Sequence, residues 1–301
     1  MKAVLLAGGS GSRLYPLSTY VTKQLLPVYD KPLIYYPLST LMTLGIRDIL
    51  IITNNNDLEN IKALLGNGRC YGINISYETQ DRPRGIAHGL IIAKEFLEGQ
   101  ACCLILGDNI FYGADIYNNK ENNKFKDMVN NLQEGAYTVG YRVADSERYG
   151  VLEFGPNQEI ISIEEKPKIP KSNWVSTGIY LFDNKAPLIA ESLSPSHRGE
   201  LEITDVLNHY LENKRLKYFL LGRGTAWLDA GTPEALIEAS QFVYNVEKRQ
   251  GIKISCLEEI AFKKGFISLN EFLNIINKIP KNCEYRKYLQ KIFQENKESK
   301  I

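Results

Sequence analysis

The sequence has no excess of charge of either sign and no apolar run long enough to span a bilayer. Its 36 Lys and Arg residues balance 35 Asp and Glu residues, so the formal net charge is +1 and no bulk basic field attracts nucleic acid. The run after Lys2 holds five apolar residues before the glycines, too few for a signal peptide or a membrane span. We therefore expect a cytoplasmic protein that binds neither nucleic acid nor membranes.

Cysteine and histidine are also scarce. The five cysteines are an odd number without a C-x-x-C pair, which indicates reduced thiols rather than a disulfide scaffold. His88, His197 and His209 lie far apart in the sequence and show no metal-ligand spacing, so we do not expect a structural zinc site. The composition is that of a globular protein, and 301 residues suffice for one large domain or two small ones.

Three continuous apolar runs in the first half predict parallel strands that are covered on both faces. They lie at residues 2–7, 48–53 and 101–106, and helical patterns at residues 57–65 and 85–97 separate them. Predicted strands that alternate with predicted helices are typical of a parallel sheet with crossover helices. The first half therefore predicts an α/β fold with helices on both faces of its sheet.

The second half predicts a mixed sheet followed by helices. Shorter, more alternating segments (AYTVGYRV, YGVLEF, EIISIEE, WVSTGIYLF) begin near residue 136. Helical patterns resume at residues 201–211 and after Gly231, where Thr232-Pro233-Glu234 supplies an N-cap, a proline at the first helical position and an acid in the first turn. We expect residues 1–250 to form one α/β domain and residues 251–301 a helical extension packed on it.

The first candidate site is a glycine-rich loop, LLAGGSGSRLYPLS, directly after the first apolar run. Gly8, Gly9 and Gly11 let the backbone turn tightly and point several N–H groups toward one anion, and Arg13 adds a charged fork. The loop lacks the third glycine of a Rossmann motif, because Leu14 stands there, and it lacks the Gly-Lys-Ser/Thr of a Walker A loop. It indicates a phosphate site. The alternative is an ordinary strand-to-helix turn.

Three further residues could complete a site for a nucleotide and a metal. Lys23, which precedes Gln24 in KQLLPV, could neutralise a second phosphate as a compact charge. Asp108 follows the third apolar run, at the sheet edge where open α/β folds bind ligands. Magnesium uses one or two carboxylates plus substrate phosphates, and Asp229 in WLDAG is the candidate second carboxylate. Taken singly, these residues could equally be a surface lysine and two turn or cap residues.

A second cation pair could hold a second phosphorylated substrate. Glu165 and Lys166 close the segment EIISIEEKP, and Arg198 precedes the helix expected at residues 201–211. By spacing alone these are surface features. The residues that could line a sugar pocket, through ring stacking or close backbone approach, are Tyr149, Gly150, Trp174 and Gly178. Buried aromatic residues more often simply pack.

Taken together, these motifs resemble those of the sugar nucleotidylyltransferases, and within that family the enzymes that use dTTP. The matching strings run in the expected order from residue 3 to about residue 231: LLAGGSGSRLYPLS, KQLLPVYDKPLIYYPLSTLM, LILGDNIFYG, ERYGV, EEKP, STGIYLFD, RGELEITDV and AWLDAGT. The resemblance implies a Rossmann-like nucleotide-diphospho-sugar transferase fold with a mainly parallel central sheet. It also implies conversion of dTTP and glucose 1-phosphate to dTDP-glucose and pyrophosphate, an early step toward dTDP-rhamnose and related sugars.

The resemblance further implies roles for individual residues. A nucleotide site is implied at Gly8, Gly11, Ser12, Arg13, Lys23, Gln24, Gln80, Gly85 and Asp108, where Gln80 and Gly85 match the positions that recognise the base. A sugar-phosphate site is implied at Asn109, Tyr149, Gly150, Glu165, Lys166, Gly178 and Arg198. Mg²⁺ ligands are implied at Asp108 and Asp229, and the catalytic set is Arg13, Lys23, Asp108, Lys166 and Asp229. Members of the family are typically homotetramers, built as dimers of dimers, with feedback inhibition at a second site.

The sequence departs from the family pattern at three places. The base-recognition segment carries Arg84 and His88 where an acid or small residue and a glutamine are usual, which leaves the choice between dTTP and UTP open. Ser176 stands near the sugar where an apolar residue is usual. Ala114 stands where members with a regulatory site often have histidine. Two alternatives to a thymidylyltransferase remain: a uridylyltransferase or broad-specificity enzyme, and a non-catalytic sensor of sugar nucleotides.

Overall fold

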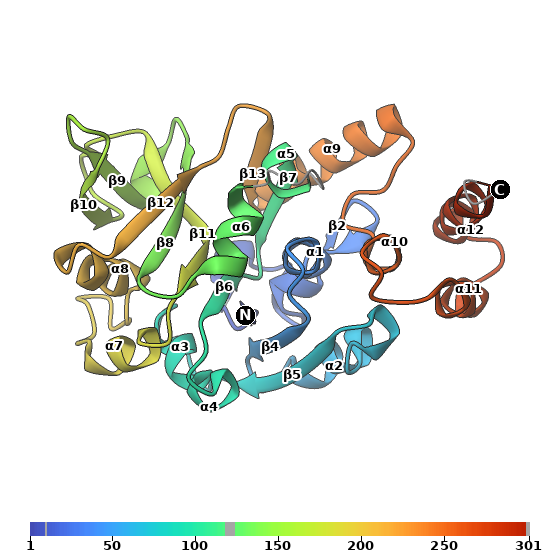
Figure 1. Cartoon of the computed structure of the whole chain (residues 1–301), viewed down its shortest axis with the longest axis horizontal. Helices are drawn as coiled ribbons and strands as arrows, with labels where there is room; N and C mark the ends of the chain where they lie inside the picture. Colours follow the sequence, from blue (N-terminus) through green and yellow to red (C-terminus); the bar gives the residue numbers. More distant parts are fainter. Residues whose placement is uncertain (10, 118–123, 299–301) are drawn as a thin grey trace.

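The computed structural model describes residues 1–9, 11–117 and 124–298. Ser10 of the glycine-rich loop and the last three residues of the expected helical extension lie outside the described residues. The chain folds around a mixed sheet with helices on both faces (Figure 1), as the sequence predicts. Two smaller antiparallel pairs of strands lie beside this sheet, and one of them helps to form the site.

The parallel half of the sheet follows the three apolar runs. In the order β6-β1-β4-β5, the strands are β6 (Cys102–Leu106), β1 (Lys2–Leu6), β4 (Asp48–Thr53) and β5 (Asn74–Thr79). All three neighbouring pairs are parallel, so the carboxyl ends of these strands meet at one edge of the sheet. The loops that follow β1, β5 and β6 contain the glycine-rich segment, Gln80 and Asp108.

The remaining strands of the sheet give it its mixed character. They are β8 (Ala136–Arg142), β9 (Gly150–Phe154), β10 (Ile160–Glu165), β11 (Trp174–Phe182) and β12 (Leu216–Leu220). β11 runs antiparallel to β6, β8 and β9, whereas β12 pairs parallel with β8. The pairing of β11 with β8 shifts register between Ser176 and Tyr180, which places Gly178 in the irregular stretch.

Two hydrophobic clusters cover the two faces of the sheet. One face packs against α1 (Tyr35–Thr43), α2 (Leu58–Leu65) and α6 (Lys124–Asn131), and the other against α3 (His88–Ile92), α4 (Lys94–Leu97), α7 (Ala186–Ser192) and α8 (Ile203–Glu212). Successive β1 residues alternate between the clusters, since Ala3 and Leu5 lie in the first and Val4 in the second. This alternation, with both faces buried, explains the continuous apolar runs in the sequence.

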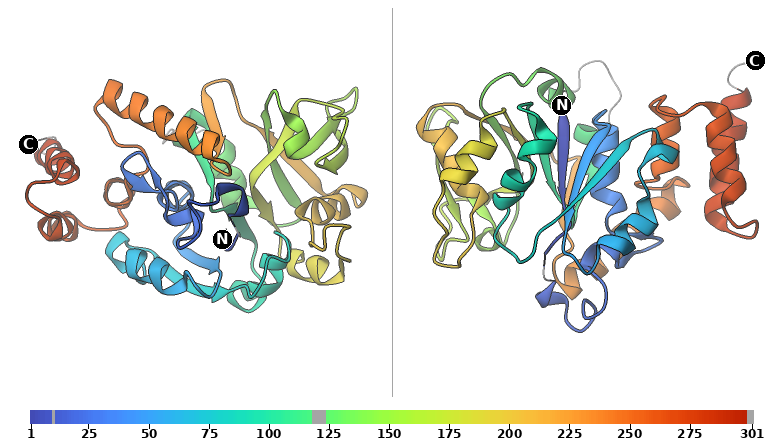
Figure 2. Two further views of the ribbon diagram at one scale, coloured as in Figure 1. Left: turned by 180° about the vertical axis from the view of Figure 1, so that it is seen from behind. Right: turned by 90° about the horizontal axis from the view of Figure 1, so that it is seen from below.

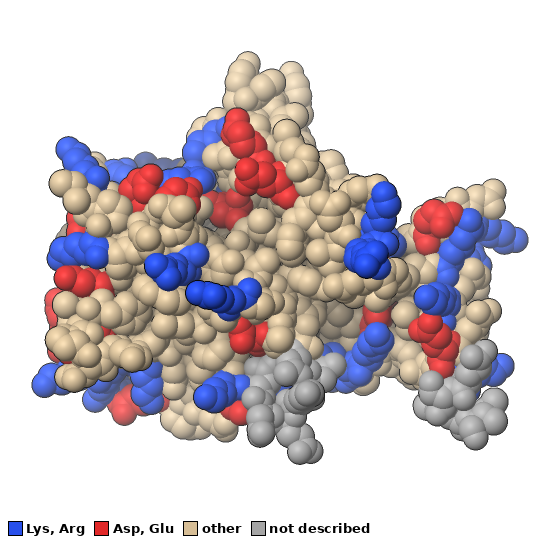
Figure 3. Space-filling view, turned by 90° about the horizontal axis from the view of Figure 1, so that it is seen from above, with Lys and Arg blue, Asp and Glu red and all other residues tan. Residues whose placement is uncertain are grey.

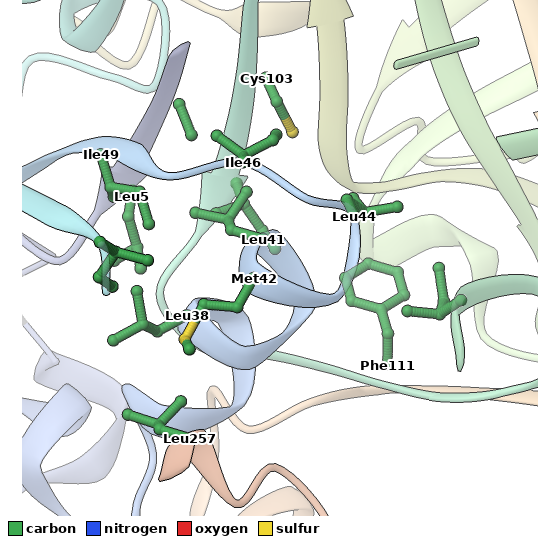
Figure 4. Packing of buried hydrophobic residues seen from close by; sticks show 14 of the residues in the cluster. Leu5, Leu38, Leu41, Met42, Leu44, Ile46, Ile49, Cys103, Phe111 and Leu257 are labelled. Carbon is green, nitrogen blue, oxygen red and sulfur yellow. The ribbon is translucent and has the colours of Figure 1, made fainter. Parts of the chain in front are cut away.

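Helix α1 lies at the centre of the first cluster. Its Leu38, Leu41 and Met42 pack beside Leu5 of β1 and Leu257 of the C-terminal part of the chain (Figure 4). The sequence patterns did not single out this helix. The residues from Tyr36 to Thr43 are all buried, so the segment has no polar face and shows no helical period.

The C-terminal part of the chain is helical, as expected. α9 (Pro233–Gln250) starts at Thr232, whose side chain accepts a hydrogen bond from the backbone N–H of Ala235 at 3.2 Å. α10 (Leu257–Lys263), α11 (Leu269–Lys278) and α12 (Glu284–Glu298) follow, and α11 and α12 lie at the end of the molecule away from β9 and β10 (Figures 1 and 2). Tyr285 and Tyr288 of α12 bond to buried Glu258 and Glu259 of α10, at 2.6 and 2.5 Å. None of the described helices combines the length and the hydropathy of a bilayer span.

Charges of both signs are distributed over the surface. On the face shown in Figure 3, Lys and Arg side chains are interspersed with Asp and Glu among the described residues. This distribution agrees with a net charge of +1 and gives that part of the face no continuous basic surface.

Candidate active site

The site begins where the parallel strands end. After β1 the chain turns through Gly8 and Gly9, and a side chain at Gly8 would come within 3.3 Å of the backbone of Thr53 at the end of β4. Gly11 has φ +60°, a conformation that glycine adopts without strain. Gly107 lies tightly against the end of β1, because a Cβ there would lie 2.6 Å from the carbonyl oxygen of Leu6. The glycines thus bring the loops after β1 and β6 into close contact.

A cavity of about 340 Å³ opens over this edge of the sheet. Trp174, one of the residues considered for a sugar pocket, does not line it. All but one of the residues to which the resemblance assigns a role do line it: Gly8, Gly11, Ser12, Arg13, Lys23, Gln24, Gln80, Gly85, Asp108, Asn109, Tyr149, Gly150, Glu165, Lys166, Gly178 and Asp229. Residues from the expected nucleotide site and from the expected sugar-phosphate site therefore share one cavity. Arg198 is the exception.

Lys23 and Asp108 form an ion pair inside the cavity. Lys23 lies in a short 3-10 helix (Lys23–Leu25), and its ammonium group contacts Oδ2 of Asp108. Burial raises the pKa of the Asp108 carboxyl, but the charge and hydrogen bond of Lys23, with a hydrogen bond from Asn109, outweigh burial and lower the pKa overall. Asp108 is therefore held ionised.

Asp229 reaches the same place from another element. It ends β13 (Thr225–Asp229), which pairs antiparallel with β7 (Asn109–Gly113) so that Asp229 lies opposite Asn109, the neighbour of Asp108. The backbone N–H of Ala230 also donates to the carbonyl of Asp108 at 3.0 Å. Burial, and then the charge of Asp108, raise the pKa of the Asp229 carboxyl, and Lys23 and two arginines oppose the rise. The carboxylates of Asp108 and Asp229 thus repel each other within the cavity.

The two arginines are Arg13 and Arg148. Arg13 Nη2 and Asp229 Oδ1 lie 3.0 and 2.8 Å from the position that a Cβ on Gly231 would occupy, so only a glycine leaves them this space. Arg148 Nη1 donates to Asp145 at 2.8 Å, and its Nη2 lies 3.9 Å from Asp229 Oδ2. That Nη2 atom is buried and has no hydrogen-bond partner within the described residues. The sequence analysis did not propose Arg148, although it lies within the motif ERYGV.

The side chain of Asn109 connects Asp108 to two neighbouring strands. Its Nδ2 donates to Asp108 at 2.9 Å, and its Oδ1 accepts from the indole N–H of Trp227 at 2.5 Å and from the backbone N–H of Gly178 at 3.1 Å. A Cβ on Gly178 would lie 2.6 Å from Oδ1. In this structure the side chain of Asn109 therefore orients Asp108, and Trp227 is a second residue that the sequence analysis did not propose.

Glu165 and Lys166 form a second ion pair in the lining of the cavity. Lys166 and Glu165 lie 3.5 Å apart, and Lys166 has φ +46°, an uncommon value for a residue with a side chain. Burial raises the pKa of the Glu165 carboxyl. Arg198 does not line the cavity, because its guanidinium is held by Glu202 at 2.7 Å and reaches only the edge of Glu165 at 3.5 Å.

Ser176 and Ala114, two departures from the family pattern, have defined surroundings. Ser176 lines the cavity, but its hydroxyl lies 2.6 Å from that of Thr138, so its polarity is satisfied within the protein. Ala114 begins a short helix (Ala114–Tyr117) away from the cavity lining.

The donor set suits a divalent cation shared with a phosphorylated ligand. Among the described residues there is no group of three or more His, Cys, Asp or Glu side chains that could enclose a metal. Asp108 and Asp229 supply two carboxylates in the cavity, and the mutual repulsion that raises the pKa of Asp229 is what a cation relieves. A magnesium ion commonly takes one or two carboxylates and completes its coordination with water and substrate phosphates, so the residues present fit such an ion.

Comparison with known proteins agrees with this geometry. The sequence model of the nucleotidyl transferase family matches residues 2–246. A glucose-1-phosphate thymidylyltransferase from Neisseria meningitidis is 48% identical over 98% of this chain and 100% of its own length. A crystal structure of a Bacillus anthracis protein named as a glucose-1-phosphate thymidylyltransferase, in complex with a sucrose, is 40% identical and superimposes with a TM-score of 0.73, covering 80% of this chain and 94% of that one. A UDP-glucose pyrophosphorylase in complex with UDP-glucose, 24% identical, shares the fold with a TM-score of 0.69 over 81% of this chain and 98% of its own.

A glycine-rich loop and Asp108 at the carboxyl ends of parallel strands, with Asp229 of the neighbouring β7–β13 pair in the same cavity, are typical of a nucleotide-binding α/β enzyme. The chain belongs to the nucleotidyl transferase family. Enzymes of this family are generally metal-dependent.

Proposed function

We propose that the chain transfers the thymidylyl group of dTTP to α-D-glucose 1-phosphate, forming dTDP-glucose and pyrophosphate. The observation that carries this proposal is that one cavity holds the glycine-rich loop with Arg13 and Lys23, the paired carboxylates Asp108 and Asp229, and the Glu165–Lys166 pair. Relatives that are 44–52% identical over most of their length carry this activity in their names.

The triphosphate would lie along the glycine-rich loop. Backbone N–H groups of Gly8, Gly9, Gly11 and Ser12 and the side chains of Arg13 and Lys23 would bind its oxygens. The base would extend toward Gln80 and Gly85, which lie at the ends of other elements along the same edge. Glucose 1-phosphate would bind on the opposite wall, where Tyr149, Gly150 and Glu165 would contact the sugar and Lys166 its phosphate.

The reaction joins two anions, so repulsion is the main obstacle. An oxygen of the sugar phosphate attacks the α-phosphorus of dTTP while the bond to the β-phosphate oxygen breaks and pyrophosphate leaves. Lys166 would hold the attacking phosphate, and Arg13 and Lys23 would neutralise charge that develops on the leaving pyrophosphate. No general base is needed, because the second pKa of a phosphate monoester is about 6 and the nucleophile is already ionised at neutral pH.

We assign Mg²⁺ as the metal, with Asp108 and Asp229 as the residues that would hold it. Bound there, it would supply positive charge to the phosphate oxygens of the nucleotide. The contribution of the protein is to keep both carboxylates ionised and correctly placed, through Lys23, Asn109 and the pairing of β7 with β13.

Arg198 keeps a proposed role at the sugar phosphate. The guanidinium of Arg198 does not line the cavity. To contact the phosphate, it would have to break its ion pair with Glu202. Otherwise it would act on the phosphate only indirectly, through its contact with Glu165. Arg148 is a further candidate for a phosphate contact, because one of its buried nitrogen atoms has no hydrogen-bond partner among the described residues.

Several broader features also belong to this proposal. We expect residues 1–250 to form the catalytic domain, with residues 251–301 as an extension, and the enzyme to assemble as a homotetramer in the cytoplasm. The five cysteines are all free thiols, which fits a reducing compartment. A sensor without catalysis is the less favoured alternative, because a simple binder has no need of two carboxylates that repel each other.

A substrate panel tests the proposal. Pyrophosphate release should be measured with Mg²⁺ for dTTP, UTP, CTP, ATP and GTP, each against glucose 1-phosphate and several other sugar phosphates. We expect the highest kcat/KM for dTTP with glucose 1-phosphate. Preference for UTP would favour a uridylyltransferase, and nucleotide binding without pyrophosphate release would favour a sensor.

A further inference from the structure

Gln80 lines one end of the cavity, and His88 contacts its side chain from outside the lining. Gln80 follows β5, and its backbone N–H donates to the carbonyl of Thr53 at 2.8 Å. β1 and β4 separate β5 from β6, the strand that Asp108 follows, which places the ends of β5 and β6 roughly 14 Å apart. Gln80 therefore lies well away from the metal-binding carboxylates, at a distance that suits the base of a nucleotide whose phosphates lie near Asp108.

This end of the cavity suits a flat, weakly polar ring. Leu6, Pro83, Gly85 and Ile86 line it beside Gln80. A side chain at Gly85 would collide with the backbone of Leu201 at 2.3 Å, so this wall is closely packed. Within this part of the lining, Gln80 has the one uncharged side chain that can both donate and accept hydrogen bonds.

The side-chain amide of Gln80 contacts the imidazole of His88. Nε2 of Gln80 lies 2.9 Å from Nδ1 of His88, which belongs to the first turn of α3. An amide nitrogen can only donate, so Nδ1 accepts and the imidazole is neutral with its proton on Nε2. Rotating the amide by 180° would place its oxygen against the lone pair of Nδ1, and the hydrogen bond would re-form only if the imidazole proton moved from Nε2 to Nδ1.

The orientation of an amide matters for the recognition of a pyrimidine. A 4-oxopyrimidine such as thymine or uracil presents an N3–H donor beside an O4 acceptor, whereas a 4-aminopyrimidine such as cytosine presents an acceptor beside a donor. An amide held in one orientation matches one of these patterns and opposes the other. An amide that rotates freely can match both.

We propose that His88 is a positioning residue that fixes the Gln80 amide and so selects 4-oxopyrimidine nucleotides over 4-aminopyrimidine nucleotides. The proposal rests on the proposed function, because it takes the ligand at this end of the cavity to be the base of the nucleotide. His88 itself touches neither the phosphates nor the reacting atoms, and it does not line the cavity.

The surroundings of His88 favour its neutral form. Burial lowers the pKa of the imidazole, Arg84 lowers it further, and Asp81 opposes them. Arg84 is itself bound to Asp81 at 3.1 Å. Other charged groups on the elements packed against α3 are Lys2 of β1, Lys94 and Glu95 of α4, Glu191 of α7, and Glu200 on the neighbouring loop. Lys2 pairs with Glu98 and Lys94 with Glu191. Arg84 and His88 are the two departures from the family pattern in this segment, and the charge of Arg84 would help to keep His88 neutral.

The ratio of kcat/KM for dTTP to that for dCTP is the appropriate measurement, because effects on the shared triphosphate and metal cancel in it. We expect His88→Ala to lower this ratio about tenfold, the loss of one oriented base contact, with the KM for glucose 1-phosphate within about twofold of wild type. Equal losses with both nucleotides would mean that His88 only supports the fold, and would overturn the proposal.

His88→Asp is the control, since a carboxylate oxygen can take the place of Nδ1 as an acceptor but, while ionised, cannot donate to the Gln80 oxygen. We expect it to keep the wild-type ratio. Because the pKa of His88 is lowered, the wild-type ratio should stay constant from about pH 8 to about pH 6.5 and fall only at lower pH, as His88 binds a proton, while the ratio of His88→Asp should stay constant down to about pH 5. A ratio that is independent of pH in the wild type, or the same pH dependence in both proteins, would contradict the proposal. This comparison also decides the matter if His88→Ala fails to fold.

Failure of this inference and failure of the proposed function give different results. If the wild type does not release pyrophosphate from dTTP and glucose 1-phosphate, the proposed function is wrong. If the wild type forms dTDP-glucose but the ratio does not respond to His88, only the role of His88 is wrong.

Discussion

The ammonium group of Lys23 lies against the carboxylate of Asp108, although 85 residues separate the two in the sequence. Both groups are largely buried, and each would be costly to bury alone. Binding of a metal to Asp108 would release Lys23 to contact the nucleotide phosphates. The pair therefore keeps the carboxylate ionised and the lysine in place until the substrates arrive.

Replacing Asp108 with asparagine should abolish turnover while the chain still folds, with a lower Tm because buried Lys23 loses its partner carboxylate. The side chain keeps its shape but loses the charge that we propose binds the metal. Pyrophosphate release and circular dichroism measure the two parts of this prediction. Asp127→Asn, on the exposed surface of α6, is the matched control and should behave as wild type. Wild-type kcat in Asp108→Asn would contradict the assignment.

Replacing Arg13 with alanine should lower kcat at least ~100-fold and affect the KM for glucose 1-phosphate far less. The reason is that Arg13 lies on the glycine-rich loop beside Asp229, where the triphosphate would bind. Steady-state kinetics with each substrate varied in turn will measure both constants. Arg223→Ala, an exposed arginine away from the cavity lining, is the control. A change confined to the KM for the sugar phosphate would show that Arg13 acts elsewhere.

Gly178→Ala should reduce both stability and activity. The added methyl group would lie 2.6 Å from Oδ1 of Asn109 and disturb the contacts that orient Asp108. Crowding of this kind typically costs about 1–3 kcal/mol of unfolding free energy. Urea unfolding and kcat should therefore both change. Gly224→Ala, where an added Cβ meets nothing within 4 Å, should change neither.

Without metal, Asp229→Asn should be more stable than wild type at neutral pH, by a few degrees in Tm. Since folding raises the pKa of Asp229, its contribution to stability is present below the pKa of the unfolded chain and is lost as the pH rises through the raised value. The stability difference should therefore disappear near about pH 4, where the carboxyl is protonated. Thermal melts over this pH range will measure it.

Adding Mg²⁺ should then reverse the order of stability. It should raise the Tm of the wild type at about pH 8 more than at about pH 5, because protons compete for Asp229 at the lower pH, and it should raise the Tm of Asp229→Asn least. An equal rise in both proteins would place the metal elsewhere.

The sequence predicts the part of the fold that depends on local patterns. The apolar runs that became β1, β4 and β6 are buried on both faces, so their continuity predicts parallel strands, and parallel strands place Gly8 and Asp108 at one edge. The sequence indicated Asp229 only as a candidate for the second carboxylate beside Asp108. The position of Asp229 at this edge depends on the register of β13 against β7, a long-range contact that no local pattern encodes.

The remaining features depend on which side chains pair in three dimensions. Arg198 was placed at the sugar phosphate, but Glu202, four residues further along, holds its guanidinium outside the cavity lining. Asn109, predicted to contact the sugar phosphate, lines the cavity, and its bonds to Asp108, Trp227 and Gly178 are further contacts that its sequence position does not predict. The contact between Gln80 and His88 could not be predicted, because Gln80 lies before the loop of residues 81–87 and His88 in the helix that follows this loop.

The formation of dTDP-glucose and pyrophosphate in equal amounts from dTTP and glucose 1-phosphate is the most direct test. Mass spectrometry can follow both products in one reaction, first with Mg²⁺ and then with excess EDTA. We predict one-to-one formation with the metal and none with the chelator. Failure to form both products with Mg²⁺, or undiminished turnover in EDTA, would contradict the conclusion that this cavity brings a nucleotide, a metal and a sugar phosphate together for reaction.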